Sequence, residues 1–214
     1  MIVEVVRSEP DRKRKPWLRG LAFLLPLFVF LLSPPARGAD GAWLSGQTGT
    51  LNWFDTANWV SGTVPGLLTG STNTDIATFG SNTGSALITI DAGRNVRSLL
   101  FNGTNTLGLY TVGSAGANLG EALRLSSGGS ITVSPGTLTA TTIHAPLIFE
   151  ALNSTSNGTY TITNNSTTAA SAFANDNLYK LNLLGNLSGG TTSGTITLNF
   201  TGTSGSRGVD ASAN

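Results

Sequence analysis

Apolar side chains alternate with Ser, Thr and Asn along much of this chain, in short runs that glycine interrupts. Residues 123–149 show the pattern most clearly. An extended backbone sends alternate side chains to opposite faces, so this spacing predicts short β-strands with one buried face. The single histidine, His144, falls on the outward face. Five apolar residues are expected to be buried in stacked rows: Leu125, Ile131, Val133, Ile143 and Leu147.

Similar strands are predicted through the rest of the chain, with no helix of ordinary length between them. Two dipeptides are predicted as turns, because Gly128-Gly129 reaches positive φ without strain and Pro135-Gly136 presets the first corner of a turn. Residues 169–176 fit either a single helical turn or a loop. The predicted strands are residues 86–90, 96–101, 109–112, 123–125, 131–133, 141–149, 159–163, 178–184 and 195–200.

The spacing of these strands favours an all-β fold of the parallel β-helix type, also called a β-solenoid. Apolar positions follow one another at short, unequal intervals, at Ile131, Ile143, Ile162, Leu181 and Ile196. Coils of a solenoid stack strand on strand and tolerate unequal loops at their corners, which fits an irregular period. A β-sandwich is the alternative, because Asn-Gly pairs favour β-hairpins. The two pairs are Asn102-Gly103 and Asn157-Gly158.

Residues 1–39 have the three parts of a secretory signal peptide. Residues 1–20 carry six Lys or Arg residues, residues 21–32 are uniformly apolar or Pro, and residues 33–39 are mostly small or helix-breaking. The apolar run, residues 21–32, is too short for a bilayer span, which requires about 20 residues. We predict cleavage near Gly38 or Ala39 and secretion or surface display of the rest; an uncleaved membrane anchor is the alternative.

Charge is concentrated in this N-terminal segment. Seven of the twelve Lys and Arg residues lie in the first 38 positions, and from Ala39 onward the net charge is 5 − 8 = −3. Nucleic-acid binding requires clustered basic residues, so DNA and RNA are excluded as partners. The chain has no cysteine, which excludes disulfides, thiolate metal sites and cysteine catalysis.

Residues 40–84 are turn-rich, and their aromatic residues follow neither strand nor helix periodicity. We interpret these aromatics as a cap, because the first coil of a solenoid exposes its core end-on. The alternative is a glycan-binding site in which Trp43, Trp53 and Trp59 stack on sugar rings. The five aromatic residues are Trp43, Trp53, Phe54, Trp59 and Phe79.

Candidate metal ligands are few. Ca²⁺ prefers oxygen ligands, which Asp55, Asn58, Asn73 and Asp75 offer. They lack the spacing of a calcium-binding loop, so solvated turn residues are the preferred interpretation. His144 is the only histidine, which excludes a two-histidine site. We therefore predict no metal and no cofactor.

Catalysis is also not predicted. Four carboxylates stand beside predicted turns: Asp91, Glu121, Glu150 and Asp176. General acid and base catalysis requires two carboxyls at a fixed separation in a cleft, whereas these residues fall on different coils. Arg94 and Arg97 lie near Asp91 in the sequence, and we interpret them as a charged corner.

Two groups of segments carry a family resemblance. The first group is residues 53–59 (WFDTANW), 62–65 (GTVP), 75–79 (DIATF) and 96–101 (VRSLLF); the second is residues 131–133, 143–147, 183–189 and 196–198. In this order they resemble the start of bacterial proteins of the autotransporter-associated β-strand repeat type. The resemblance implies a right-handed parallel β-helix, secreted or on the cell surface, that serves as stalk, adhesin or matrix.

The expected organisation is therefore a signal peptide at residues 1–39, a cap at 40–84 and solenoid coils at 85–214, truncated at the C-terminal end. Long, uncharged, hydroxyl-rich sides suit weak polyvalent contact with glycans, with host or neighbouring cell surfaces, or with other copies of the chain. We expect a non-catalytic structural or adhesive protein. A secreted carbohydrate-binding module is the second hypothesis, and a polysaccharide-degrading enzyme is the third.

Overall fold

The computed structural model describes residues 39–70, 72–103, 109–116, 119–137, 141–150, 157–166, 181–189, 194–202 and 209–211. The chain divides into two units, Met1–Arg37 and Gly38–Asn214, and every described residue belongs to the second. Residues 1–38 of the predicted signal peptide, the possible helical turn at 169–176 and the carboxylate Asp176 lie outside the described residues.

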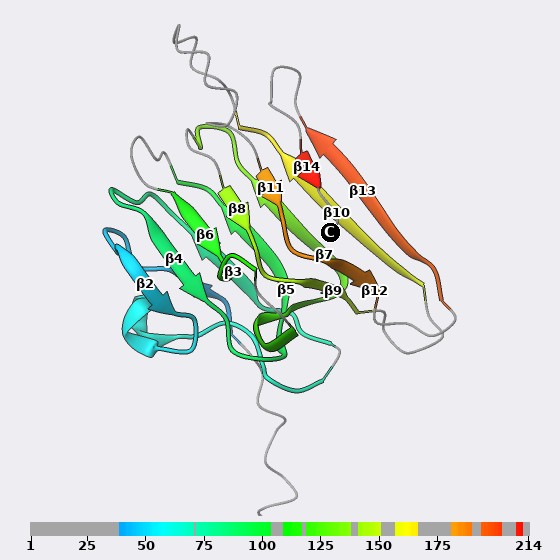
Figure 1. The fold of residues 1–214 in the computed structure, drawn as a ribbon, viewed down its shortest axis with the longest axis horizontal. Coiled ribbons are helices and arrows are strands. Elements are labelled where there is room, and N and C mark those ends of the chain that lie inside the picture. Colours follow the sequence, from blue (N-terminus) through cyan, green and yellow to red (C-terminus); the bar gives the residue numbers. More distant parts are fainter. Residues whose placement is uncertain are drawn as a thin grey trace, which may run out of the picture. The chain divides into compact units, whose positions relative to one another are not determined.

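The described residues of the second unit are all-β and form two parallel sheets in two layers (Figure 1). One sheet, here the first sheet, has the order β1-β3-β5-β7-β10-β13, and the second has the order β14-β11-β8-β6-β4-β2. Strands of the first sheet are β1 (Gly41–Ala42), β3 (Ile76–Phe79), β5 (Arg94–Phe101), β7 (Leu123–Val133), β10 (Gly158–Asn164) and β13 (Ile196–Gly202). Strands of the second are β2 (Gly49–Asn52), β4 (Ala86–Thr89), β6 (Tyr110–Val112), β8 (Thr141–Ile143), β11 (Leu181–Leu183) and β14 (Val209–Ala211).

Shorter elements complete the coils. Strands β9 (Leu147–Phe149) and β12 (Leu187–Gly189) also belong to the first sheet, off its main order; they pair with each other, and β9 also pairs with β7. In the described connections the 3₁₀ turns are η1 (Thr56–Asn58), η2 (Val60–Gly62) and η3 (Leu119–Glu121).

The pairing of the strands is that of the solenoid class predicted from the sequence. The chain passes repeatedly from one sheet to the other, and all pairs of named strands in the described residues are parallel. A parallel pair requires a crossover connection, which here includes the strand of the opposite sheet. The antiparallel hairpins of the alternative β-sandwich do not occur between these strands.

Burial follows the predicted alternation. Leu125, Ile131, Val133, Ile143 and Leu147 are all at most 2% exposed, which confirms the predicted rows. His144 is half-buried on the outward side of that pattern.

The spacing between equivalent positions is longer than the sequence intervals suggested. Ile131 pairs with Ile162 of the next coil, and Ile143 pairs with Leu183. The short interval from Ile131 to Ile143 therefore steps from one sheet to the other and does not measure a full coil. The coils differ in length because the connections between their strands differ in length.

The predicted turn at Gly128-Gly129 is wrong, because β7 continues through these residues and bends. Residues 123–125 pair with 94–96 of β5, residues 130–133 pair with 98–101, and the register shifts between them. A Cβ on Gly129 would lie 2.1 Å from the carbonyl oxygen of Arg97. Gly129 thus permits a close backbone approach inside the strand, and Gly128 adopts a φ of +75° that favours glycine. Pro135 and Gly136, by contrast, do form a turn.

The strands begin to stack before residue 85, which was the predicted start of the solenoid coils. Strands β1, β2 and β3 all lie between residues 40 and 84, and they pair with β3, β4 and β5. The turn-rich segment therefore supplies strands to both sheets in addition to its aromatic residues.

Candidate functional site

The three tryptophans of the described residues form one packed group, in which Trp59 contacts both Trp43 and Trp53. Trp43, Trp53 and Trp59 are 3%, 0% and 1% exposed. The ring centroids of Trp43 and Trp59 are 4.9 Å apart with the planes nearly perpendicular, and those of Trp53 and Trp59 are 5.1 Å apart. The edge-to-face contact of Trp43 with Trp59 stabilises this pair beyond the area that it buries.

Phe79 joins this aromatic cluster to the core of the coils. Its ring centroid lies 5.8 to 6.0 Å from those of the three tryptophans and 4.9 Å from that of Phe101, on which it stacks. Phe54 is 58% exposed, so the prediction that it packs in the cluster is wrong. We call Trp43, Trp53, Trp59 and Phe79 the aromatic cluster.

Hydrogen bonds fix two of the indoles in place. Trp53 Nε1 donates to the carbonyl oxygen of Pro65 at 3.0 Å, and Trp59 Nε1 donates to that of Trp53 at 2.6 Å. Trp43 Nε1 is buried with no partner among the described residues. A sugar platform requires an exposed ring face, and the three buried indoles offer none. Their arrangement favours the cap over the glycan-binding alternative.

The four candidate calcium ligands are used in local hydrogen bonds. Asp55 Oδ1 accepts from the backbone nitrogen of Ala57, and Asp75 Oδ2 accepts from that of Gly66 at 2.8 Å. Asn58 and Asn73 donate to the backbone carbonyls of Asn52 and Asn95. Among the described residues no three His, Cys, Asp or Glu side chains lie together as a metal site would require.

Each candidate catalytic carboxylate in the described residues also has a local partner. Asp91 forms a two-pronged ion pair with Arg94, whose Nε lies 3.0 Å from Asp91 Oδ1. Glu121 Oε2 accepts from the backbone nitrogen of Ser114 at 2.8 Å. Glu150 is paired with Arg124.

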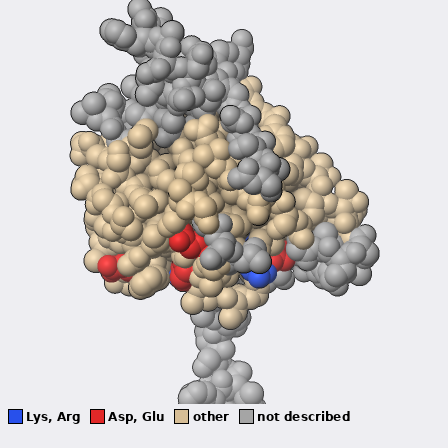
Figure 2. Space-filling model, viewed as in Figure 1, with Lys and Arg blue, Asp and Glu red and all other residues tan. Residues whose placement is uncertain are grey.

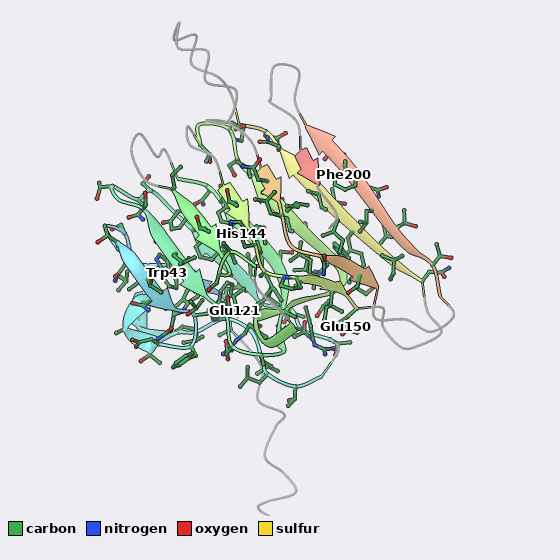
Figure 3. All side chains as sticks on the ribbon, viewed as in Figure 1. Trp43, Glu121, His144, Glu150 and Phe200 are labelled. Atoms are coloured by element: carbon green, nitrogen blue, oxygen red, sulfur yellow. The ribbon has the colours of Figure 1, made fainter. Side chains whose placement is uncertain are left out.

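These carboxylates sit on different elements. Glu121 lies in η3 and Glu150 directly after β9 (Figure 3). Each of them is held by its own local partner.

Two buried tyrosines, Tyr110 and Tyr160, have raised pKa values. Burial raises the pKa of Tyr110 to about 12. Burial, and secondarily the negative charge of Glu150, raise the pKa of Tyr160 to about 12. The hydroxyl of Tyr110 donates to the carbonyl oxygen of Gly80 at 3.0 Å, and that of Tyr160 donates to the carbonyl oxygen of Glu150. Both tyrosines are neutral donors within the core at physiological pH.

Outward hydroxyl and amide side chains form aligned rows across neighbouring strands. On the first sheet Thr132, Thr163 and Thr201 are in register, and the hydroxyls of Thr163 and Thr201 are 2.7 Å apart. A second row on the same sheet is Ser130, Thr161 and Asn199. On the second sheet the row is Thr111, Thr142 and Asn182. We call these rows the hydroxyl ladders.

The sequence predicted outward Ser and Thr but not which of them align. Alternation assigns each residue to a face, whereas alignment between coils depends on the lengths of the connections. The repeated Thr-x-Thr spacing at Thr159, Thr161 and Thr163 was the available signal for a ladder.

Most of the described surface in one view carries neither Lys or Arg nor Asp or Glu, and the acidic side chains gather along its lower edge (Figure 2). This distribution agrees with the neutral, polar character of the ladders. None of the helices in the described residues has the length and apolar character needed to cross a membrane.

Comparisons with family models, with curated proteins and with solved structures found no match to this chain.

Proposed function

We propose that the chain is an exported, non-catalytic structural or adhesive β-solenoid of the cell surface or extracellular matrix. The observation that carries the proposal is the set of hydroxyl ladders on parallel strands. Neighbouring strands lie about 4.8 Å apart, so each ladder repeats uncharged hydroxyl or amide groups at a fixed spacing. A repeated, uncharged surface of this kind suits a repeated, uncharged ligand.

Neutral glycans are the partner class that this chemistry fits. Each Thr, Ser or Asn side chain offers donors and acceptors to sugar hydroxyls. A single such bond contributes about 1 kcal/mol net, so useful binding requires many contacts at once, as multivalent attachment provides. Host or neighbouring cell surfaces would present such glycans in dense arrays.

The resemblance to the autotransporter-associated repeat proteins is part of the same proposal. It implies right-handed winding of the coils and display outside the cell. The parallel pairing of the strands supports a β-helix, and the local pairing of Asp91, Glu121 and Glu150 supports a role without catalysis. The burial of Trp43, Trp53 and Trp59 weighs against a carbohydrate-binding module built on their rings.

A ladder variant tests the proposal. The triple substitution Thr132→Val, Thr163→Val and Thr201→Val removes three aligned hydroxyls and keeps β-branched side chains. We expect the exported chain to bind immobilised neutral polysaccharides, and the triple variant to bind at least about tenfold more weakly, since three bonds of about 1 kcal/mol are removed. Circular dichroism should be unchanged.

The matched control is Thr111→Val with Thr142→Val, which alters the ladder of the second sheet instead. Retained binding in the control would assign the contact to the first sheet. A wild-type chain that binds none of the polysaccharides or cell surfaces would contradict the adhesive role, and cleavage of a bound polysaccharide would contradict the non-catalytic role.

A further inference from the structure

Two Asn-Gly pairs, Asn102-Gly103 and Asn157-Gly158, begin the same tripeptide, Asn-Gly-Thr, at two places in the chain. Asparagine is chemically labile, and it is most so before glycine. The backbone nitrogen of the next residue attacks the side-chain amide, and glycine has no Cβ to obstruct this approach. The two pairs therefore have similar intrinsic reactivity, and a difference between them in the folded chain has to come from their surroundings.

Both reacting groups of the second pair are held by hydrogen bonds. Asn157 Oδ1 accepts from the backbone nitrogen of Thr195 at 2.8 Å. The backbone nitrogen of Gly158 donates to the carbonyl oxygen of Thr195 at 2.9 Å. Gly158 is also the first residue of β10 and pairs with Ile196 of β13. The Asn157 side chain cannot turn toward the Gly158 nitrogen unless these bonds open.

The first pair lacks this restraint. Asn102 directly follows the last residue of β5 and is exposed. Its backbone nitrogen donates to the carbonyl oxygen of Phe79 at 3.0 Å, which holds the main chain but not the side chain. Within the described residues neither the side-chain amide of Asn102 nor the backbone nitrogen of Gly103 has a hydrogen-bond partner. The amide is therefore free to rotate onto the nitrogen that attacks it.

We propose that Asn102 is a site of spontaneous deamidation in the folded chain, and that Asn157 is protected from the same reaction. The backbone nitrogen of Gly103 attacks Cγ of Asn102, and the new N–Cγ bond closes a succinimide ring. The bond from Cγ to the amide nitrogen breaks, and this nitrogen leaves as ammonia with the proton of the Gly103 nitrogen. Water then opens the ring, at Cγ to give aspartate or at the backbone carbonyl carbon to give isoaspartate.

Either product places a carboxylate at an exposed position that was uncharged. Isoaspartate has a second effect, because it adds one methylene to the main chain between Phe101 and Gly103. Gly103 has no room to move toward the residue that follows β3, since a Cβ there would lie 2.3 Å from the carbonyl carbon and oxygen of Gly80. The isoaspartate form is therefore less stable than the aspartate form. Neither effect depends on the proposed adhesive role.

Ageing of the folded chain, followed by peptide mass spectrometry, tests the proposal. The exported protein is incubated at mildly alkaline pH, which favours removal of the proton from the attacking nitrogen. Samples are then unfolded and digested with trypsin at mildly acidic pH, which limits further reaction. Cleavage after Arg97, Arg124 and Lys180 places the two Asn-Gly pairs in different peptides, residues 98–124 and 125–180. Fragmentation of each peptide identifies the converted asparagine.

We expect Asn102 to convert at least about tenfold faster than Asn157 in the folded chain, since two hydrogen bonds of about 1 kcal/mol each have to open at Asn157. In urea the two rates should converge, because the tripeptides are identical. No conversion at Asn102, or equal rates at the two sites in the folded chain, would overturn the proposal. A difference that persists unchanged in urea would overturn its assignment to the fold.

Two variants at Asn102 complete the test. Asn102→Gln lengthens the side chain, so the corresponding ring closes far more slowly, and peptide 98–124 should then keep its mass. Conversion of this peptide in Asn102→Gln at the wild-type rate would show that another asparagine reacts. Asn102→Asp has the new charge without the added methylene. Aged wild type that contains isoaspartate should melt at a lower temperature than Asn102→Asp, and equal melting temperatures would overturn the proposed effect on stability.

Discussion

Two buried tyrosine hydroxyls make the fold sensitive to high pH. Each pKa rises from 10.0 to about 12, because burial disfavours the charged form. A group whose pKa is raised in the folded state binds its proton more tightly there than in the unfolded state. Its contribution to stability is complete below pH 10 and is lost as the pH rises toward about 12.

We therefore expect the free energy of unfolding to fall between pH 10 and about 12. Urea denaturation at a series of pH values measures it. Tyr110→Phe with Tyr160→Phe should flatten this dependence, and each substitution should cost about 1 kcal/mol near pH 7 through a lost hydrogen bond. An equally steep fall in the double variant would show that other groups cause it.

At Gly129 the fold leaves no room for a side chain. A Cβ there would lie 2.1 Å from the carbonyl oxygen of Arg97 and 2.8 Å from that of Ser126. Because both neighbours are backbone, strand β7 or β5 has to shift. We expect Gly129→Ala to lower the free energy of unfolding by about 1–3 kcal/mol, the usual cost of overpacking.

The control for Gly129 is Gly80→Ala, where an added Cβ meets nothing within 4 Å. Its effect on the same urea transition should be within about 0.5 kcal/mol, as for ordinary surface substitutions. Equal losses at the two positions would contradict the close approach of β7 to Arg97.

At the scale of elements, the aromatic cluster anchors the first strands. Trp59 contacts Trp43, Trp53 and Phe79 and donates a hydrogen bond to the backbone of Trp53. Trp59→Ala removes these contacts together, so we expect a loss of about 3–5 kcal/mol. Thermal unfolding followed by circular dichroism measures the loss. Phe54→Ala, at the exposed aromatic position, is the matched control and should change stability little.

The same variants separate the cap from a sugar platform. As a platform, Trp59→Ala would abolish glycan binding and leave the melting temperature unchanged. As part of the cap, it destabilises the fold, and the loss exceeds that of Phe54→Ala. An unchanged melting temperature would contradict the packing role of the cluster.

The sequence allowed us to predict which face of each strand is buried, but not which strands pair with one another. Alternation alone placed Leu125, Ile131 and Ile143 in the core, because it depends only on strand geometry. Register depends on connections of unequal length, so Ile143 looked like the neighbour of Ile131 although it lies in the other sheet. A local pattern of apolar residues does not show whether the next strand belongs to the opposite sheet of the same coil or to the same sheet of the next coil.

The errors around β7 and in residues 40–84 have related causes. Two glycines usually mark a reversal of the chain. Here the backbone of Arg97 approaches Gly129 so closely that glycine is needed within the strand, and Gly128 has a φ of +75°, which favours glycine. Strand β1 has only two residues, too few to show alternation. The buried indoles were predicted as a group, whereas the exposure of Phe54 depends on tertiary packing that composition does not show.

At the scale of the whole molecule, the described surface has polar and apolar parts. Polar ladders run along the outer faces of the sheets, and apolar surface is exposed at the edge strand β13. In a solenoid each coil is stabilised chiefly by its neighbours.

Export is the premise on which any surface role depends, and its test concerns residues 1–39. A signal peptide requires an uninterrupted apolar segment, which residues 21–32 provide. We expect a bacterial host to export the chain and to remove this segment, so that the N-terminal sequence of the exported protein begins near Ala39. Phe28→Arg places a charge within the apolar segment and should retain the chain inside the cell. Leu18→Arg adds the same charge to the preceding basic region and should be exported. Equal export of both variants, or an exported protein that keeps Met1, would contradict a cleaved signal peptide.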